Sequence, residues 1–409
     1  MRYIFILLLL TTASFLTSVT LDECLDYFME NHPIPQKEDL LSQNSEDIIE
    51  LFRKEWYPKL SLNGSFMWNA NTMELGMQSV EKDKTQLELL LSQPIFTGNE
   101  ISLNREIELL NNAIRKNSLA ESTFRIKKLI YTLYFNTLMA EQKSEITQLS
   151  LDHWYETADF VKLRQASGKA SSLDSLLVAN LILSQKETLV NLSQIREESI
   201  SLLNNLLKTE ISFDTDFQEP PETSLSQSEI RRKELLIFTL REDNFELQQK
   251  VNTSVYFPKL TAYAKGTYGN PNYNLYANEW AENMEVGLSF KWNFWNWGQE
   301  GKRNRLLERK KQINSLEKDE FLTQVNTELL QTESKIGQID NSLKIKQMKL
   351  EVLQKIVAIY YENYRLGKSD VLTYSEKQME QQQLEESIEL LRLEKLYQKY
   401  IYNLIIGVL

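Results

Sequence analysis

The residue types that usually perform chemistry are scarce in this chain of 409 residues. His32 and His153 are its two histidines, too few for an imidazole metal cluster or a histidine-based catalytic triad. The sequence has no glycine-rich loop of the kind that binds phosphate. Its carboxylates include no pair on a rigid turn at the end of a predicted strand, which a rival class, an exported glycosidase, would need. We therefore expect no enzyme, and no catalytic, cofactor-binding or metal-binding residues.

Charge and cysteine content narrow the class of protein further. The chain carries 57 acidic against 46 basic residues, a net charge of -11, and it has no basic stripe. This balance argues against a nucleic-acid partner. Cys24 is the single cysteine, so no intrachain disulfide can form. The preceding Leu21-Asp22-Glu23 lacks the small residue expected before a lipidated cysteine, and we interpret Cys24 as a free thiol on a helix.

The N-terminus has the layout of a secretory signal peptide over residues 1–20. Met1-Arg2-Tyr3 precedes an apolar run from Ile4 to Leu10, and small or hydroxylated residues follow up to Thr20. Neither this run nor any later one approaches the roughly 20 apolar residues of a membrane-spanning helix. The sequence predicts an exported protein, which could lie in a membrane only as a β-barrel.

The chain repeats its own pattern after about 200 residues. Trp56-Tyr57-Pro58-Lys59-Leu60 returns as Tyr256-Phe257-Pro258-Lys259-Leu260, and Gly168-Lys169 returns as Gly367-Lys368. The segment Phe96-Thr97-Gly98-Asn99 likewise has a counterpart in Trp295-Asn296-Trp297-Gly298. We predict a duplication with three parts after the signal peptide: a first repeat at 21–209, a linker at 210–229 rich in Pro, Ser, Thr, Glu and Gln, and a second repeat at 230–409.

Each repeat is predicted to contain a hairpin of strands, at about 58–95 and about 257–296. Every second residue is apolar from Leu60 to Trp68, and again from Met284 to Phe294. Strands of about ten residues with one apolar and one polar face fit either a half-buried soluble sheet or a barrel facing lipid. Aromatic residues at the strand ends and the signal peptide favour the barrel. Because four strands cannot close one, several chains must share it.

The rest of each repeat is predicted to be a long helical hairpin. No proline occurs from Ile95 to Glu219, and Gly337 is the only glycine between Lys302 and Leu366. A seam spaced 3-4-7-3-4-3-4 marks coiled-coil packing; it comprises Ile336, Ile339, Leu343, Leu350, Leu353, Val357, Tyr360 and Tyr364. The predicted hairpins are 99–208, with its tip at 167–170, and 299–408, with its tip at 366–369.

The order of these features resembles the TolC-like outer membrane efflux proteins, or outer membrane factors. Signal peptide, Leu21-Asp22-Glu23-Cys24-Leu25 helix, Tyr57-Pro58-Lys59-Leu60, strand hairpin, long helix and Gly-Lys turn follow one another and then repeat. The resemblance covers essentially the whole mature chain. It implies a mixed α+β membrane protein, in which a homotrimer forms one 12-stranded outer-membrane β-barrel continued by a periplasmic α-helical barrel.

The same resemblance implies a function. The trimer would be a passive exit duct of a tripartite efflux or type I secretion system. Its partners would be a periplasmic adaptor, or membrane fusion protein, and an inner-membrane RND or ABC transporter. An alternative stays open, a periplasmic coiled-coil scaffold or adaptor without a pore. Adaptors typically have compact β domains and a single helical hairpin, whereas here two hairpins of strands flank two helical pairs.

The resemblance also implies two sets of functional residues. The tip that contacts the adaptor would comprise Gly168, Lys169, Ala170, Gly367, Lys368 and Ser369, although the two glycines are also explained as helix caps. The periplasmic gate would comprise Asp174, Tyr364 and Glu376. Asp174 stands where the family often has an aspartate facing the closed aperture, and Tyr364 where a tyrosine bonds to it.

Two positions depart from the family pattern at the gate. Thr373 stands where a second acid would correspond to Asp174, and Ser369 where the best-known member has an arginine. Glu376 could supply an acidic ring by threefold repetition, or it is an ordinary solvated helix residue.

Overall fold

The computed structural model describes residues 18–71, 73–75, 78–80, 82–168, 171–226, 229–273, 279–366, 368 and 371–408. These residues divide into two compact units. The sheet unit comprises residues 37–119 and 233–321. The hairpin unit comprises the described residues up to 36, together with 120–232 and 322–409.

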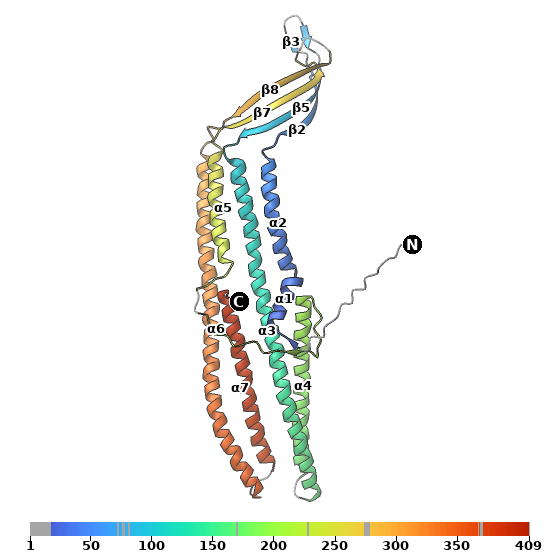
Figure 1. Ribbon diagram of the computed structural model, residues 1–409, viewed down its shortest axis with the longest axis vertical. Helices are drawn as coiled ribbons and strands as arrows, with labels where there is room; N and C mark the ends of the chain where they lie inside the picture. Colours follow the sequence, from blue (N-terminus) through green and yellow to red (C-terminus); the bar gives the residue numbers. More distant parts are fainter. Residues whose placement is uncertain are drawn as a thin grey trace, which may run out of the picture. The chain divides into compact units, whose positions relative to one another are not determined.

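One antiparallel sheet of four strands dominates the sheet unit. The strands β2 (Lys59–Trp68), β5 (Asp83–Phe96), β7 (Lys259–Asn270) and β8 (Ala281–Lys291) lie in the order β2-β5-β7-β8 (Figure 1). The two hairpins of the duplication therefore share one sheet through the β5–β7 pair. Two shorter strands, β3 (Met73–Leu75) and β4 (Gln78–Val80), pair in the connection between β2 and β5.

The two faces of this sheet differ in chemistry, as the alternation predicts. The register places Leu62 opposite Leu89, and Ala264 opposite Val286. Leu62 is 65% exposed and Val286 is 76% exposed, so the apolar face is uncovered in the single chain. On the other face, the Lys265 ammonium lies 3.0 Å from the carboxylate of Glu285.

Buried asparagines join the helices of the sheet unit. These helices are α2 (Pro33–Lys54), α5 (Leu235–Ser254) and the first segments of α3 (Glu100–Ala166) and α6 (Gln299–Arg365). Asn112 on α3 donates to Leu41 O on α2 at 2.6 Å. Asn244 on α5 donates to Asn111 Oδ1 on α3 at 2.9 Å, and Asn314 on α6 donates to Phe238 O on α5 at 2.8 Å. Side-chain amides thus fix the register of neighbouring helices, because a buried amide needs its partner.

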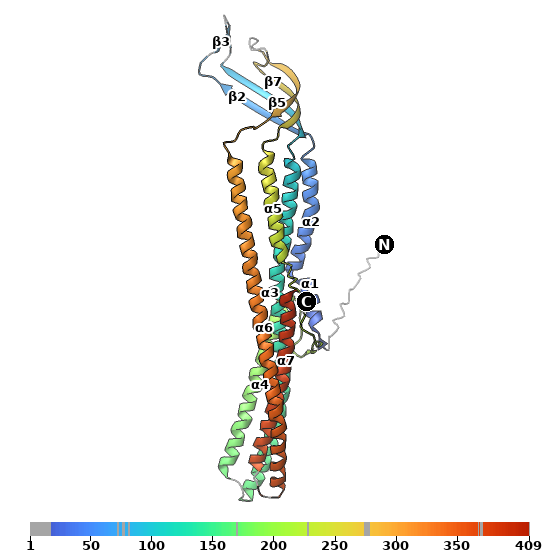
Figure 2. The same cartoon turned by 90° about the vertical axis from the view of Figure 1, so that its left-hand side faces the viewer.

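The long helices form two antiparallel pairs that match in length, and α3 and α6 begin in the sheet unit. α3 returns as α4 (Ser172–Leu207), and α6 returns as α7 (Val371–Ile406); each pair has 67 and 36 residues (Figure 1, Figure 2). The backbone before each long helix repeats as well. Gly98 and Asn99 have φ of 62° and 65°, and Trp297 and Gly298 have φ of 49° and 69°. The duplication is therefore present in the fold, down to the turns that start the helices.

The predicted seam on α6 is the covered side of that helix. Ile336, Ile339 and Leu353 are buried, whereas Ile345 and Met348 between them are exposed. The remaining seam positions, Leu343, Leu350, Val357, Tyr360 and Tyr364, are half-buried. The packing that the 3-4 spacing predicts thus forms between helices of one chain.

The predicted linker packs against the helices of the hairpin unit. Its β6 (Asp216–Phe217) pairs with the N-terminal strand β1 (Ser18–Val19) in parallel. Tyr400 on α7 donates to Pro221 O at 3.0 Å, and the Lys399 ammonium lies 2.7 Å from the carboxylate of Glu222. The linker, which has little regular structure beyond β6, therefore has ordered polar partners.

The N-terminal helix α1 (Leu21–Asn31) belongs to the hairpin unit. Thr20 and Glu23 form a capping box at its start, so residues that the sequence assigns to the signal peptide contribute to the fold. Cys24 on α1 is a buried free cysteine. Burial raises the pKa of the Cys24 thiol to about 12. Among the helices that the structure describes, none has a segment apolar and long enough to cross a bilayer.

Candidate functional site

The first Gly-Lys turn joins α3 to α4. Gly168 has φ of 71°, in the left-handed region that glycine adopts most readily after a helix end. A Cβ at this position would meet no atom within 4 Å, so backbone conformation rather than space accounts for the glycine. Lys169 and Ala170 lie outside the described residues.

Asp174 belongs to the cap of α4. Its carboxylate accepts a hydrogen bond from Ser171 N at 2.8 Å, and Asp174 N donates to Ser171 Oγ at 3.2 Å. This reciprocal pair is a capping box. The Ser171-x-x-Asp174 spacing is a signal of this cap in the sequence. Asp174 therefore has a structural role independent of any gate.

Tyr364 lies in a group of rings that we name the tip aromatic cluster, made of Phe160, Tyr361, Tyr364 and Tyr374. The rings of Tyr364 and Tyr374 are stacked, with centroids 5.8 Å apart and planes at 4°. Phe160 meets Tyr364 edge-on at 6.4 Å, and Tyr361 lies 5.7 Å from Tyr374. Burial raises the pKa of Tyr374, with Tyr361 and Tyr364 as further causes. The cluster connects α3, α6 and α7.

The other predicted tip and gate residues are placed as follows. Lys368 N donates to Asn363 O at 2.8 Å and so closes the end of α6. Gly367 and Ser369 lie outside the described residues. Glu376 is exposed on α7, two residues from Tyr374. Within the described part of the chain, Asp174 bonds to Ser171 and Tyr364 packs on rings, so a bond between Asp174 and Tyr364 stays a prediction.

Phe160 and Tyr374 are partners of Tyr364 that the sequence pattern does not predict. Both lie within about two helical turns of a predicted tip, on helices separated by some 200 residues of chain. Proximity to the tips is a weak signal, since aromatic residues are also ordinary core residues of helices. Only the packing of α3 against α6 and α7 identifies the cluster.

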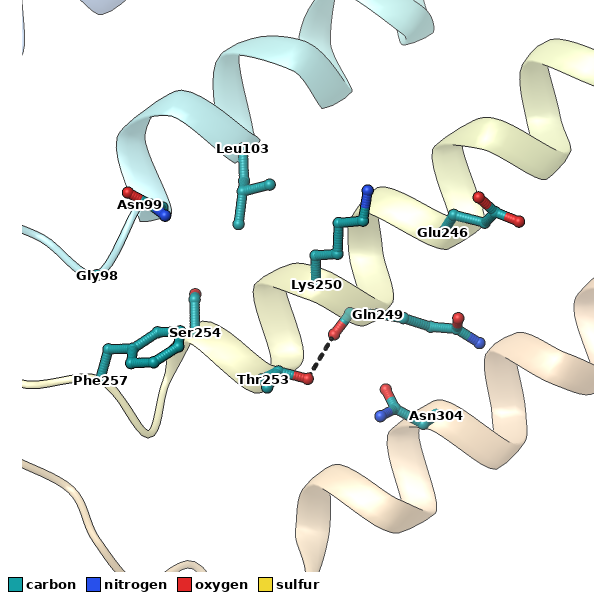
Figure 3. A pocket seen from close by; sticks show the side chains of 10 residues that line it. All are labelled: Gly98, Asn99, Leu103, Glu246, Gln249, Lys250, Thr253, Ser254, Phe257 and Asn304. Carbon is teal, nitrogen blue, oxygen red and sulfur yellow. Dashed lines mark hydrogen bonds between the residues drawn. The ribbon is translucent and has the colours of Figure 1, made fainter.

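A pocket of about 560 Å³ with several polar side chains lies in the sheet unit where α5 ends and α3 and α6 begin (Figure 3). Glu246, Lys250 and Thr253 line it from one side of α5, and Asn304 lines it from α6. Thr253 Oγ1 donates to Gln249 O at 3.2 Å. The lining offers amides, hydroxyls and one charge of each sign, but no nucleophile beside a base. It can bind polar groups, and it lacks the arrangement that covalent catalysis needs.

A second groove, of about 590 Å³, lies in the hairpin unit where α3, α4, α6 and α7 meet. Lys143 and Lys346 line it, and the Lys346 ammonium donates to Ser387 Oγ at 2.9 Å. Burial raises the pKa of the neighbouring Glu386, and the charge of Lys143 partly offsets this. Leu192, Ile195 and Leu390 also line it, so the groove between the two helical pairs is largely apolar with charged groups among its lining.

The two histidines occupy structural positions. His32 follows α1, and its ring lies 5.0 Å from that of Phe28. His153 is half-buried on α3, and burial lowers its pKa. In the described residues, no group of three or more His, Cys, Asp or Glu side chains is placed to hold a metal ion.

Comparison with known protein families gives a match over most of the chain. The family model described as outer membrane efflux protein matches residues 36–207 and 224–400. The two matched segments correspond to the two structural repeats. Among curated proteins, no significant match to the sequence is found.

Solved structures share the fold at low sequence identity. CusC has a TM-score of 0.74 and 12% identity, covering 96% of this chain and 93% of CusC. VceC from Vibrio cholerae has a TM-score of 0.70 and 12% identity, covering 95% of this chain and 96% of VceC. The CmeC outer membrane channel of Campylobacter jejuni has a TM-score of 0.69 and 12% identity, covering 95% and 85%. The pore-less scaffold gains no support from these comparisons. The chain therefore belongs to the outer membrane efflux protein family, and it is an efflux channel of the outer membrane.

Proposed function

We propose that three copies of the chain form one channel, with a shared 12-stranded barrel and a periplasmic tunnel of helices. The observation that carries this proposal is the open sheet. β2 and β8 each have one neighbour among the described strands, so each has an unpaired edge. Unpaired backbone groups in lipid cost several kcal/mol each, and only a closed barrel removes them. Pairing β8 of one copy with β2 of the next closes the barrel with three copies of four strands.

The two faces of the sheet support one orientation of the strands in the proposed barrel. The apolar face, with Leu62, Leu288 and Val286, contacts lipid. The opposite face, with Asn63, Lys265 and Glu285, lines a water-filled interior, because charged side chains are stable there and costly in hydrocarbon. We propose that this polar interior continues into the helical tunnel and conducts substrates without covalent chemistry or cofactor.

The energy for transport would come from partners. We propose that an inner-membrane RND or ABC transporter drives export, and that a periplasmic adaptor connects it to the helical tips. CmeC, which shares the fold, is described as an outer membrane channel, and the MtrE structure from Neisseria gonorrhoeae is described as an open state. We propose that the channel has an open and a resting state, and that it changes between them when its helical hairpins move as units against one another.

Assembly provides the direct test. In mild detergent, the mature protein should have three times the monomer mass by light scattering corrected for bound detergent. It should also form discrete, long-lived conductance steps in planar bilayers. As a control for peripheral attachment, washing membranes with high salt should leave the protein in the membrane fraction. A stable monomer, or release by the salt wash, would rule out the shared barrel.

Substitution of the tip residues tests the adaptor contact. Acidic replacements of Lys169, Ala170, Lys368 and Ser369 should abolish efflux while leaving trimer yield unchanged, because they reverse or introduce charge at the proposed contact. The matched control is Lys302→Glu, an exposed lysine at the start of α6. Drug accumulation in cells that carry the cognate pump is the measurement. Normal efflux by all four tip variants would mean that the adaptor binds a different surface of the channel.

A further inference from the structure

We propose that the signal peptide is removed by a cut before Val19, so that Val19 and Thr20 remain as the structured start of the mature chain. Residues 1–20 together resemble a signal peptide in sequence, but the last of them take part in the fold. The inference concerns proteolytic processing and does not depend on the proposed channel assembly.

The first observation is the β1–β6 ladder. Ser18 pairs with Asp216 and Val19 with Phe217. Gln218 N donates to Val19 O at 3.0 Å, and Gln218 Nε2 donates to Ser18 Oγ at 2.7 Å. Val19 is only 1% exposed. If Val19 were removed with the signal peptide, the folded protein would lose a buried side chain and the ladder that it forms with β6.

Tyr134 gives the second observation. It lies fully buried on α3, with its hydroxyl 2.9 Å from Val19 O and 2.6 Å from Gln218 O. The single hydroxyl hydrogen is shared between two carbonyl oxygens, one from β1 and one from the residue after β6. The Tyr134 ring also packs edge-on against Phe217 at 5.1 Å. Removal of Val19 would take away one of the two acceptors and open this buried site to water.

The cap of α1 gives the third observation. Thr20 N donates to Glu23 Oε2 at 2.8 Å, and Glu23 N donates to Thr20 Oγ1 at 3.2 Å. A cut after Thr20 would remove this capping box and leave a charged amino group on Leu21. That positive charge would lie at the positive end of the helix dipole, where it is unfavourable. The capping box is therefore kept only if Thr20 remains in the mature chain.

Cys24 argues against the other common form of processing. A lipoprotein cut would make Cys24 the first residue and attach diacylglycerol to its sulfur. Cys24 is 0% exposed, three positions into α1. No acyl-bearing thioether fits in a fully buried position, and the cut would also remove the first turn of α1. The fold therefore fits a cut upstream and a free thiol at Cys24.

The sequence offers a suitable bond upstream. Signal peptidases prefer small residues one and three positions before the cut, after the apolar run. Thr11 and Ala13 meet this requirement for the Ala13–Ser14 bond, three residues beyond Leu10. The step is hydrolysis by a membrane-bound signal peptidase, in which water gives its hydroxyl to the Ala13 carbonyl carbon and a proton to the Ser14 nitrogen. This bond is the one we expect to be cut.

N-terminal sequencing of the mature protein, purified from the outer membrane, tests the proposal. A first residue anywhere from Ser14 to Val19 supports it, with Ser14 expected. A first residue at Thr20 or later, including Cys24, overturns it, and so does an uncleaved chain that starts at Met1.

A substitution test gives an independent result. Val19→Asp places a carboxylate in the buried site, so it should lower the unfolding temperature of the mature protein by several degrees or more. Met29→Asp is the matched control and should not, because Met29 is 50% exposed on α1. The mass of the mature Val19→Asp protein should also show the substitution. A mature protein with wild-type mass and unchanged unfolding temperature would mean that Val19 is removed, and the proposal would be wrong.

Discussion

Replacing Leu288 by Arg should destabilise the inserted channel by roughly 2 to 4 kcal/mol if the residue lies near the bilayer midplane. Leu288 is 65% exposed on the apolar face of β8, opposite Ala262 on β7. In the proposed barrel this side chain contacts lipid, and a guanidinium there must either lose its hydration or distort the bilayer. The measurement is the free energy of unfolding in urea of the protein folded into lipid vesicles.

Ser289→Arg is the matched control, because it is the next residue on the same strand. Ser289 pairs with Thr261 and shares the face of Lys265 and Glu285, so its arginine would lie in water. We expect a change within about 1 kcal/mol for this variant. Equal destabilisation by the two substitutions would mean that the assignment of the lipid and water faces is wrong.

The second large effect should come from the proposed gate. Asp174→Ala combined with Tyr364→Phe should increase the conductance of single channels in planar bilayers and make cells permeable to large antibiotics. A hydrogen bond from a phenol to a carboxylate contributes about 1.5 to 3 kcal/mol in a partly dry site. Its loss should raise the open population of each copy by roughly tenfold or more. Ser369 provides no cation, so the lock should depend more on this bond than in relatives with an arginine, unless Lys368 or Arg365 takes the place of that charge.

The structure supplies the controls for this experiment. Ser171→Ala removes the hydroxyl that Asp174 N donates to, but it keeps the Asp174 carboxylate. It should weaken the start of α4 by about 0.5 to 2 kcal/mol and leave the conductance unchanged. Increased conductance in Ser171→Ala would show that the double variant acts through the helix cap. Wild-type conductance of the double variant would mean that other contacts hold the resting state.

Tyr364 itself has two possible contributions, its hydroxyl and its ring. Tyr364→Phe keeps the stacking on Tyr374 and the edge contact with Phe160. Tyr364→Ala removes both, and aromatic pairs contribute about 0.5 to 1.5 kcal/mol each beyond their buried area. Comparing the conductance of these two variants separates the hydrogen bond from the tip aromatic cluster. The same recordings test Glu376, since Glu376→Gln should weaken cation selectivity if three copies form an acidic ring.

Much of the local structure follows from the sequence alone. The alternation from Leu60 to Trp68 predicts β2 because side chains on a strand point to opposite faces. The scarcity of Pro and Gly predicts the uninterrupted helices α3 and α6, since helical hydrogen bonds are local. The repeated motifs predict the duplication, and the equal lengths of the two helical pairs bear it out.

Other features depend on contacts between residues far apart in the chain. The order β2-β5-β7-β8 joins the two repeats in one sheet, and no local pattern specifies that β5 pairs with β7. The tip aromatic cluster likewise exists only because α3 packs beside α6 and α7, which brings Phe160 to Tyr364. The spacing of residues predicts the two capping boxes. Only the hydrogen bonds of the folded chain show that Asp174 and Thr20 belong to them.

The N-terminus shows the division between the two sources of information most clearly. Sequence composition predicts an export signal at the N-terminus, because an apolar run followed by small residues is a local property. Where the folded protein begins was decided by tertiary structure. Val19 becomes part of the fold through Tyr134 and Gln218, which lie more than 100 residues away and have no signature beside it in the sequence. Local patterns determine the elements, whereas burial and hydrogen bonding between distant segments determine which residues those elements need.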